Sequence, residues 1–349
     1  MNRSIIILLL TLCVSSLFAT PSIKNKVAPG PPKKLNIITS LSVLAELTRE
    51  LGGDFVNVES LSSADQDPHF VKALPSFKRL LGNADLLIQI GRSLELWVPQ
   101  VIASSGNAKL ISGSGLITAS EGISPLEVPK ALTREQGDIH PQGNPHVWLS
   151  PSATLKMAAN IRDALIKIDA EHKAIYEKNF ASFKEKLAKK LFGEALVKAA
   201  NNNDFLWRLH EGHKLLDYVK TRKLALGGWI KEAEAINYPF FTYHSVFSYL
   251  AHEFSLKIVG QIEEKSGVAP TLKYLSELKK KAKEQKITHI VAANYYVGHK
   301  GLITTLAKDI GGHSLFIAVD CKPKQSYFEF IDQLLRELVN FKTPVKPAA

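Results

Sequence analysis

Histidine is the residue type whose placement in this chain could support specific chemistry. Of the eleven histidines, three stand in distinctive surroundings: His69 in DQDPHFVKALP, His146 in GNPHVWLSP and His244 directly after PFFTY. A proline precedes both His69 and His146, and its ring fixes the backbone around these two imidazoles. Neutral imidazole is a common ligand for zinc and other transition metals. The joint placement of the three residues therefore predicts a metal site.

Two sets of predicted strands position these histidines. Short β-rich runs alternate with amphipathic helices from Leu35 onward, a pattern typical of parallel βαβ units. The predicted strands are 35–40, 56–62, 85–91 and 109–114 in the first half, and 239–243, 257–262, 289–296 and 315–319 in the second. Ligands gather at the carboxyl ends of strands in open parallel sheets, and His69 and His244 both follow such an end. His244 also begins a predicted helix, where the helix dipole favours neutral imidazole.

The sequence therefore predicts the α/β class, with two lobes that each hold a parallel four-stranded sheet flanked by helices. Residues 152–200 contain no proline, and their only glycine is Gly193. This predicts a long, stiff backbone helix, broken once near 168–170, that joins the lobes. The predicted divisions are a signal peptide (1–19), a flexible leader (20–34), an N-terminal lobe (35–150), a connecting helical segment (151–200), an insertion (201–237) and a C-terminal lobe (238–345).

The first nineteen residues have the pattern of a secretory signal peptide. Arg3 precedes an apolar run from Ile5 to Val14 that is too short to span a bilayer, and small residues follow it. We therefore expect export, with cleavage near Ala19. The mature chain would then keep Cys321 alone and form no internal disulfide. Lipidation at Cys13 is the less favoured alternative, because a leucine stands before it where a small residue is usual.

Composition excludes several classes of protein. With 45% hydrophobic and 22% charged residues and a mean hydropathy of -0.01, the chain is neither mainly disordered nor a polytopic membrane protein. Two cysteines exclude a disulfide scaffold and a four-thiolate zinc site. The net charge of +11 permits a nucleic-acid partner, but no aromatic-basic cluster or reader motif accompanies it, so we expect none.

Three segments, DPHFVKALPS, NPHVWLSP and TYHSVFSYLAHEFSLKIVG, resemble the histidine motifs of the zinc- and manganese-binding solute receptors of bacterial ABC importers. The resemblance runs from about Leu35 to the helix SYFEFIDQLLRELVNF. It implies two α/β lobes joined by a long helix, with one transition-metal ion bound as cargo by His69, His146 and His244. It also implies a monomeric periplasmic receptor that delivers this ion to a membrane permease and catalyses no reaction.

The resemblance leaves the fourth ligand open. Family members often supply a carboxylate from the last strand, which here points to Asp320; Glu263 and a water molecule are the alternatives. Three nitrogens and one carboxylate suit tetrahedral Zn(II), while Mn(II) prefers more oxygen donors, so zinc is the expected cargo and manganese the alternative. The acidic, histidine-rich loop of many zinc receptors is missing. His140 in GDIHPQGNPH is expected to be a solvated loop residue, with a collecting or ligand-supporting role as the alternative.

Two other functions fit parts of this pattern. A secreted zinc hydrolase would also use three histidines and a water molecule, but it needs a general base, and the chain has no HExxH motif. Glu253 is the nearest candidate; it lies roughly 13 Å along the predicted helix from His244 and is expected at the surface. A surface adhesin would account for the basic helices, but only their charge supports it.

Overall fold

The computed structural model describes residues 34–129, 140–265 and 267–341. The predicted signal peptide (1–19), Cys13 and the predicted leader up to residue 33 lie outside the described residues, as does the end of the predicted C-terminal lobe beyond residue 341. Among the described helices, none combines the length and the apolar composition needed to cross a membrane.

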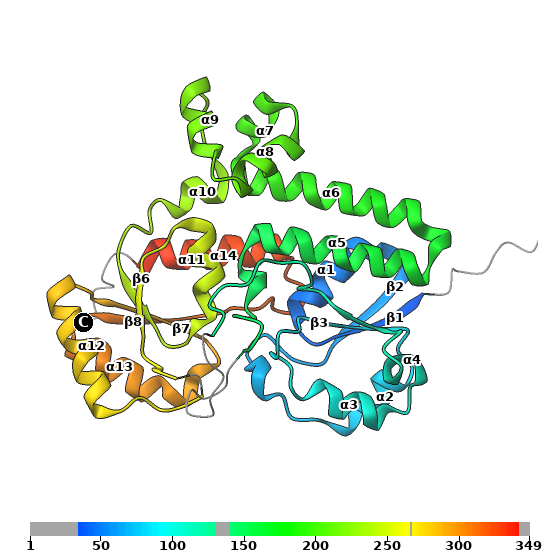
Figure 1. The fold of residues 1–349 in the computed structure, drawn as a ribbon, viewed down its shortest axis with the longest axis horizontal. Helices are drawn as coiled ribbons and strands as arrows, with labels where there is room; N and C mark the ends of the chain where they lie inside the picture. Colours follow the sequence, from blue (N-terminus) through cyan, green and yellow to red (C-terminus); the bar gives the residue numbers. More distant parts are fainter. Residues whose placement is uncertain (1–33, 130–139, 266, 342–349) are drawn as a thin grey trace, which may run out of the picture. The chain divides into compact units, whose positions relative to one another are not determined.

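Two separate parallel sheets confirm the predicted fold class (Figure 1). The first has the order β2-β1-β3-β4 and the second has the order β6-β5-β7-β8, so both place their first strand in chain order beside the second and third. The strands are β1 (Leu35–Thr39), β2 (Val56–Ser60), β3 (Leu86–Gln89), β4 (Leu116–Thr118), β5 (Phe240–Thr242), β6 (Ile258–Gln261), β7 (His289–Ala293) and β8 (His313–Ile317).

The predicted fourth strand at 109–114 is wrong. Helix α4 (Ala108–Ile111) occupies its start, because the Asn107 side chain accepts a hydrogen bond from the Lys109 amide and so caps a helical turn. Strand β4 begins only at Leu116 and pairs with β3. This short apolar run suits either a strand or a helix, and the capping residue favours the helix.

Helices cover both faces of each sheet (Figure 1). Adjacent residues of β1 show why both faces are apolar: Ile37 belongs to a large core shared by the two lobes, and Ile38 belongs to a second core under the first sheet. The flanking helices are α1 (Ser42–Gly52), α2 (Pro75–Gly82) and α3 (Val98–Ser105) in the N-terminal lobe, and α11 (Ser248–Phe254), α12 (Leu272–Gln285), α13 (Lys300–Asp309) and α14 (Tyr327–Phe341) in the C-terminal lobe.

The connecting segment is a pair of long helices, α5 (Pro151–Ile168) and α6 (Lys173–Phe192). The chain breaks where the sequence predicts, at a 3-10 turn over Ala170–His172, but it reverses there, so α6 runs back along α5 (Figure 1). Both helices pack on α1 of the N-terminal lobe. Helix α6 packs against α10 (Gly228–Ala233), which also contacts α14 of the C-terminal lobe. The long connecting helix is confirmed, and its path is corrected.

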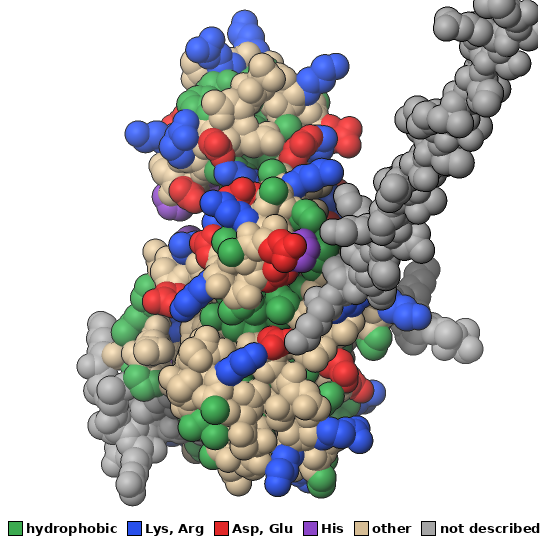
Figure 2. All heavy atoms as spheres, turned by 90° about the vertical axis from the view of Figure 1, so that its right-hand side faces the viewer, with side chains coloured by type: hydrophobic (Ala, Val, Ile, Leu, Met, Phe, Trp, Pro, Cys, Tyr) green, Lys and Arg blue, Asp and Glu red, His purple; other side chains and the backbone are tan. Residues whose placement is uncertain are grey.

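Three short helices, α7 (Glu194–Ala200), α8 (Asn203–Glu211) and α9 (Leu215–Arg222), lie beyond α6 and away from both sheets (Figure 1). Trp207 on α8 is buried, and its ring lies 5.0 Å from that of Phe192 at the end of α6. On the face shown in Figure 2, Lys and Arg side chains are scattered among Asp and Glu. Pairs such as Lys189 with Glu185 at 2.6 Å on α6 account for part of this mixture.

Candidate metal centre

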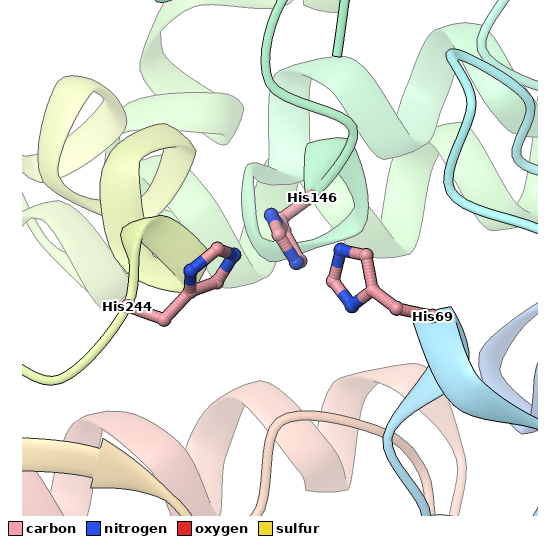
Figure 3. Close-up of side chains that lie close together, drawn as sticks. All are labelled: His69, His146 and His244. Atoms are coloured by element: carbon pink, nitrogen blue, oxygen red, sulfur yellow. The ribbon is translucent and has the colours of Figure 1, made fainter. Parts of the chain in front are cut away.

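His69, His146 and His244 converge on one point although they come from three distant parts of the chain (Figure 3). One ring nitrogen from each lies within 4.8 Å of the others, and the ring centroids are 5.2 to 5.6 Å apart. His69 lies in a 3-10 turn (Pro68–Phe70) after β2, His146 directly precedes another at Val147–Leu149, and His244 follows β5. The structure thus brings together the three histidines that the sequence singled out.

A repeated Asx-Pro-His turn orients the two histidines of the N-terminal lobe. The Asp67 Oδ1 atom accepts hydrogen bonds from the backbone N–H of His69 at 3.0 Å and from its ring Nδ1 at 2.7 Å. Asn144 Oδ1 makes the same two contacts with His146, both at 2.9 Å. One oxygen atom two residues upstream therefore fixes both the backbone and the ring of each histidine.

The orientation of the Asn144 amide follows from its other contacts. Its Nδ2 donates hydrogen bonds to Glu127 Oε2 and to the carbonyl of Ser245, both at 2.8 Å. The carbonyl oxygen of the amide must then face His146 and can only accept, so the proton of the His146 ring lies on Nδ1. The Nε2 lone pair of His146 is left free for a cation. In His69, whose Nδ1 faces a carboxylate, Nε2 contacts His140 Nε2.

In the C-terminal lobe, a remote carboxylate orients His244. The Glu263 Oε2 atom lies 2.6 Å from His244 Nδ1, and its Oε1 accepts the Gly267 N–H at 3.0 Å. Glu263 lies two residues after the end of β6, the neighbour of β5 in the sheet. Both side chains are buried, with 5% and 7% exposure. The acceptor again holds the proton on Nδ1 and leaves Nε2 of His244 free.

Burial makes it energetically costly to leave these nitrogens unpaired. The Nε2 atoms of His146 and His244 are buried and have no hydrogen-bond partner among the described residues. An unpaired buried polar group costs about 1–3 kcal/mol, and a bound cation would remove that cost. Burial, together with the neighbouring histidines, lowers the pKa of His146 well below its ordinary value. The ring is therefore neutral near pH 7 and able to donate its lone pair.

A pocket of about 300 Å³ leads to the centre and is lined by residues of both lobes, including Asp67, His69, His244 and Glu263. Aromatic side chains form much of the C-terminal wall, among them Tyr296, whose ring lies 6.2 Å from that of His244. His146 is fully buried behind this pocket. A small ion in this pocket can therefore reach two of the imidazoles, and the third imidazole is buried.

Asp320, the expected fourth ligand, is not part of this group of three histidines. Its two carboxylate oxygens accept the backbone N–H groups of Ser42, Val43 and Cys321, at 3.1, 2.7 and 2.7 Å. The N-cap residue of α1 is Leu41, whose side chain cannot accept a hydrogen bond, so Asp320 caps that helix from the other lobe. Burial raises the pKa of Asp320 to about 7 despite these bonds.

The expected positions of Glu253 and His140 are wrong. Glu253 is not at the surface: its side chain is 3% exposed and accepts hydrogen bonds from Ser152 Oγ and His210 Nε2, both at 2.8 Å. It thus ties α11 to the start of α5 and to α8 and cannot serve as the base of a hydrolase. His140 is not a solvated loop residue either. It is half-buried, its Nε2 lies 3.3 Å from that of His69, and burial lowers its pKa to about 4.

The fold is a two-lobed α/β structure with three converging imidazoles. The chain belongs to the family described as zinc-uptake complex component A, periplasmic (ZnuA), which matches residues 37–194 and 215–341. The unmatched stretch, 195–214, holds most of α7 and all of α8 and overlaps the predicted insertion.

Individual relatives agree with this assignment. The chain is 29% identical over 311 residues to the zinc-binding lipoprotein AdcA of Streptococcus pneumoniae serotype 4, covering 88% of this chain and 54% of AdcA. It is 31% identical over 160 residues to the manganese ABC transporter substrate-binding lipoprotein PsaA of Streptococcus pneumoniae, covering 45% and 49%. The chain thus spans about half the length of these relatives. A crystal structure of ZnuA has the same fold, with a TM-score of 0.65, 21% identity and coverage of 89% and 100%.

Proposed function

We propose that this protein is an exported, monomeric receptor that captures one divalent transition-metal ion and delivers it to the membrane permease of an ABC importer. The observation that carries the proposal is the convergence of three imidazoles, each with its Nδ1 held by an oxygen acceptor. His69, His146 and His244 would bind the ion through their Nε2 atoms. The similarity to AdcA, a zinc-binding lipoprotein, and to PsaA, a manganese ABC transporter substrate-binding lipoprotein, supports both the cargo class and the transporter.

Zinc is the favoured cargo. Imidazole nitrogens suit Zn(II), whereas Mn(II) prefers oxygen donors, and the carboxylates of Asp67 and Glu263 contact the histidine rings instead of lying free beside them. The same contacts argue for a receptor over a zinc hydrolase. A hydrolytic centre needs a base that can take a proton from bound water, but both of these carboxylates already accept a hydrogen bond from a ligand ring.

Calorimetric titration of the chelator-treated protein tests metal capture. We expect one tightly bound zinc ion per chain, much weaker manganese binding, and loss of tight zinc binding in His244→Ala. His252→Ala is the matched control, because His252 is exposed on the helix that follows the same turn. A wild-type chain that binds no zinc, or a His244→Ala variant that titrates like wild type, would overturn the proposal.

Delivery needs a separate measurement in cells. Deleting the gene should reduce zinc uptake and growth under zinc limitation, and restoring wild type but not His244→Ala should reverse the defect. Unchanged uptake would contradict the transport role while leaving metal binding intact.

A further inference from the structure

A fourth imidazole lies beside the three that converge. His140 is separated from His146 by only six positions in the chain, and its ring centroid lies 5.2 Å from that of His69 and 6.4 Å from that of His146. The Nε2 atoms of His140 and His69 are 3.3 Å apart. No family motif in the sequence marks this residue, so its position is a finding of the structure.

The distance between the two nitrogens has a specific meaning. Zinc binds imidazole nitrogen at about 2.0–2.1 Å in tetrahedral sites, which places two ligand nitrogens about 3.3–3.4 Å from each other. The separation between His140 Nε2 and His69 Nε2 matches that edge. His69 carries its proton on Nδ1, which faces Asp67 Oδ1, so its Nε2 presents a lone pair toward His140. Without a metal this contact is a hydrogen bond from His140 Nε2–H to that lone pair, and a cation bound by both nitrogens would replace it.

The acidic alternatives have other partners. Both oxygens of Asp320 accept backbone N–H groups at the start of α1 and at Cys321. Both oxygens of Glu263 are also engaged, one by His244 and one by Gly267. Recruiting either carboxylate to the ion would break these bonds. For His140, binding an ion would replace the Nε2 contact with His69, and its Nδ1 has no hydrogen-bond partner among the described residues.

We propose that His140 is the fourth ligand, which completes a shell of four imidazole nitrogens around zinc. This inference rests on the proposed function. His140 stands on the His69 side of the centre, and turning its side chain toward His146 and His244 closes the shell. A shell of four nitrogens contains no oxygen donor, so His140 also acts as a residue that selects zinc over manganese.

X-ray absorption at the zinc edge tests the proposal directly. We expect four nitrogen ligands in wild type and three in His140→Ala, with at least a tenfold loss of zinc affinity and a smaller change for manganese. His140→Cys gives a sharper signature, because a thiolate ligand adds a zinc–sulfur distance of about 2.3 Å. His299→Cys is the matched control: His299 lines the same pocket but lies against Tyr243, with 4.8 Å between ring centroids.

Each outcome separates the two proposals. Zinc bound by wild type with only three nitrogens, together with no sulfur signal in His140→Cys, would overturn the fourth-ligand assignment and leave the receptor proposal standing. Tighter zinc binding in His140→Ala would also overturn it, since His140 would then compete with the ion for His69. A wild-type chain without zinc would overturn the receptor proposal itself.

Discussion

The two lobes hold their histidines in different ways. In the N-terminal lobe, the acceptor for each ring Nδ1 lies two residues upstream, Asp67 for His69 and Asn144 for His146. In the C-terminal lobe, the acceptor for His244 is Glu263, nineteen residues away at the end of a neighbouring strand. The first arrangement depends on a tripeptide turn, and the second depends on the register of a sheet.

This difference separates geometry from charge. Asp67 and Asn144 make the same pair of contacts, so the Asx-Pro-His turn needs only a carbonyl-type oxygen and not a negative charge. Glu263 differs because both of its oxygens face N–H donors, one on His244 and one on Gly267. Only a carboxylate can accept at both ends. We therefore expect the C-terminal support to be the less tolerant of substitution.

Glu263→Gln should produce the largest effect of the substitutions that leave every proposed ligand in place. The amide NH₂ must face either His244 Nδ1–H or Gly267 N–H, and either choice sets two donors against each other in a buried site. Loss of such ligand support typically costs 10–100-fold in metal affinity, and we expect the upper end, about 100-fold. Competition titration with a zinc chelator measures it. Glu264→Gln, at the exposed neighbouring position, is the control, and equal affinities of the two variants would contradict this account.

Asp67→Asn should have a smaller effect, about tenfold or less. Asparagine can keep its oxygen toward His69, as Asn144 does toward His146, so the variant loses charge but retains the turn. Asp67→Ala removes the acceptor itself and should weaken zinc binding more than Asp67→Asn does. Asp65→Asn, two residues earlier and exposed, controls for charge alone. Equal losses in Asp67→Asn and Glu263→Gln would remove the distinction between the lobes.

The parts of the site that sequence predicted are those with local signals. The two Pro-His turns and the corner after β5 could be found because each lies within a few residues of its own motif. The sheets were also predictable, since parallel strands buried on both faces are apolar throughout. Amphipathic helices between the strands were predicted in general, but the residue that caps α1 was not.

The sequence was least informative where distant groups decide the structure. Asp320 follows the expected strand end, but its carboxylate accepts N–H groups at the start of α1, because Leu41 leaves that helix without a side-chain cap. The reversal after α5 has neither glycine nor proline to mark it, and packing of α5 and α6 on α1 sets its direction. His140 has no spacing signal, and only the fold brings it to His69.

The metal-free protein should also respond to pH through the N-terminal lobe. Burial is the main cause that lowers the pKa of His140 to about 4, and the neighbouring His69 and His244 act in the same direction. Histidine in the unfolded chain titrates near 6.5. Between these values the unfolded state binds a proton that the folded state does not. His140 therefore lowers the free energy of unfolding as the pH falls from about 6.5 toward 4.

Urea unfolding of metal-free wild type and His140→Gln at pH 7.5 and pH 5 measures this effect. At pH 5, wild type should lose more stability than the variant, by on the order of 1 kcal/mol after allowance for the partial exposure of the ring. His252→Gln, at an exposed position, should follow wild type. Identical pH dependence in wild type and His140→Gln would show that His140 does not stay neutral in the folded chain.

The smallest expected effect is movement between the lobes on metal loading. Helix α6 runs for twenty residues without a break, and continuous helices resist sharp bending. Buried bonds also join the lobes: Arg92 donates to Tyr249 Oη at 2.6 Å, and Trp148 Nε1 donates to the Val319 carbonyl at 2.6 Å. A wide closure would break these bonds, so we expect a shift of only a few degrees, with loop changes near the histidines.

Small-angle scattering of metal-free and zinc-loaded protein tests this rigidity, with a melting curve on the same samples. The radius of gyration should stay constant, while the melting temperature should rise, because a ligand in thousandfold excess over its Kd stabilises the folded state by about 4 kcal/mol. Tyr249→Phe removes the hydroxyl that accepts the hydrogen bond from Arg92. This variant shows how much that bond contributes to holding the lobes together. A marked decrease in radius on loading would mean that α6 and the bonds between the lobes do not hold them, and that the C-terminal histidine reaches the other two only when the ion draws it in.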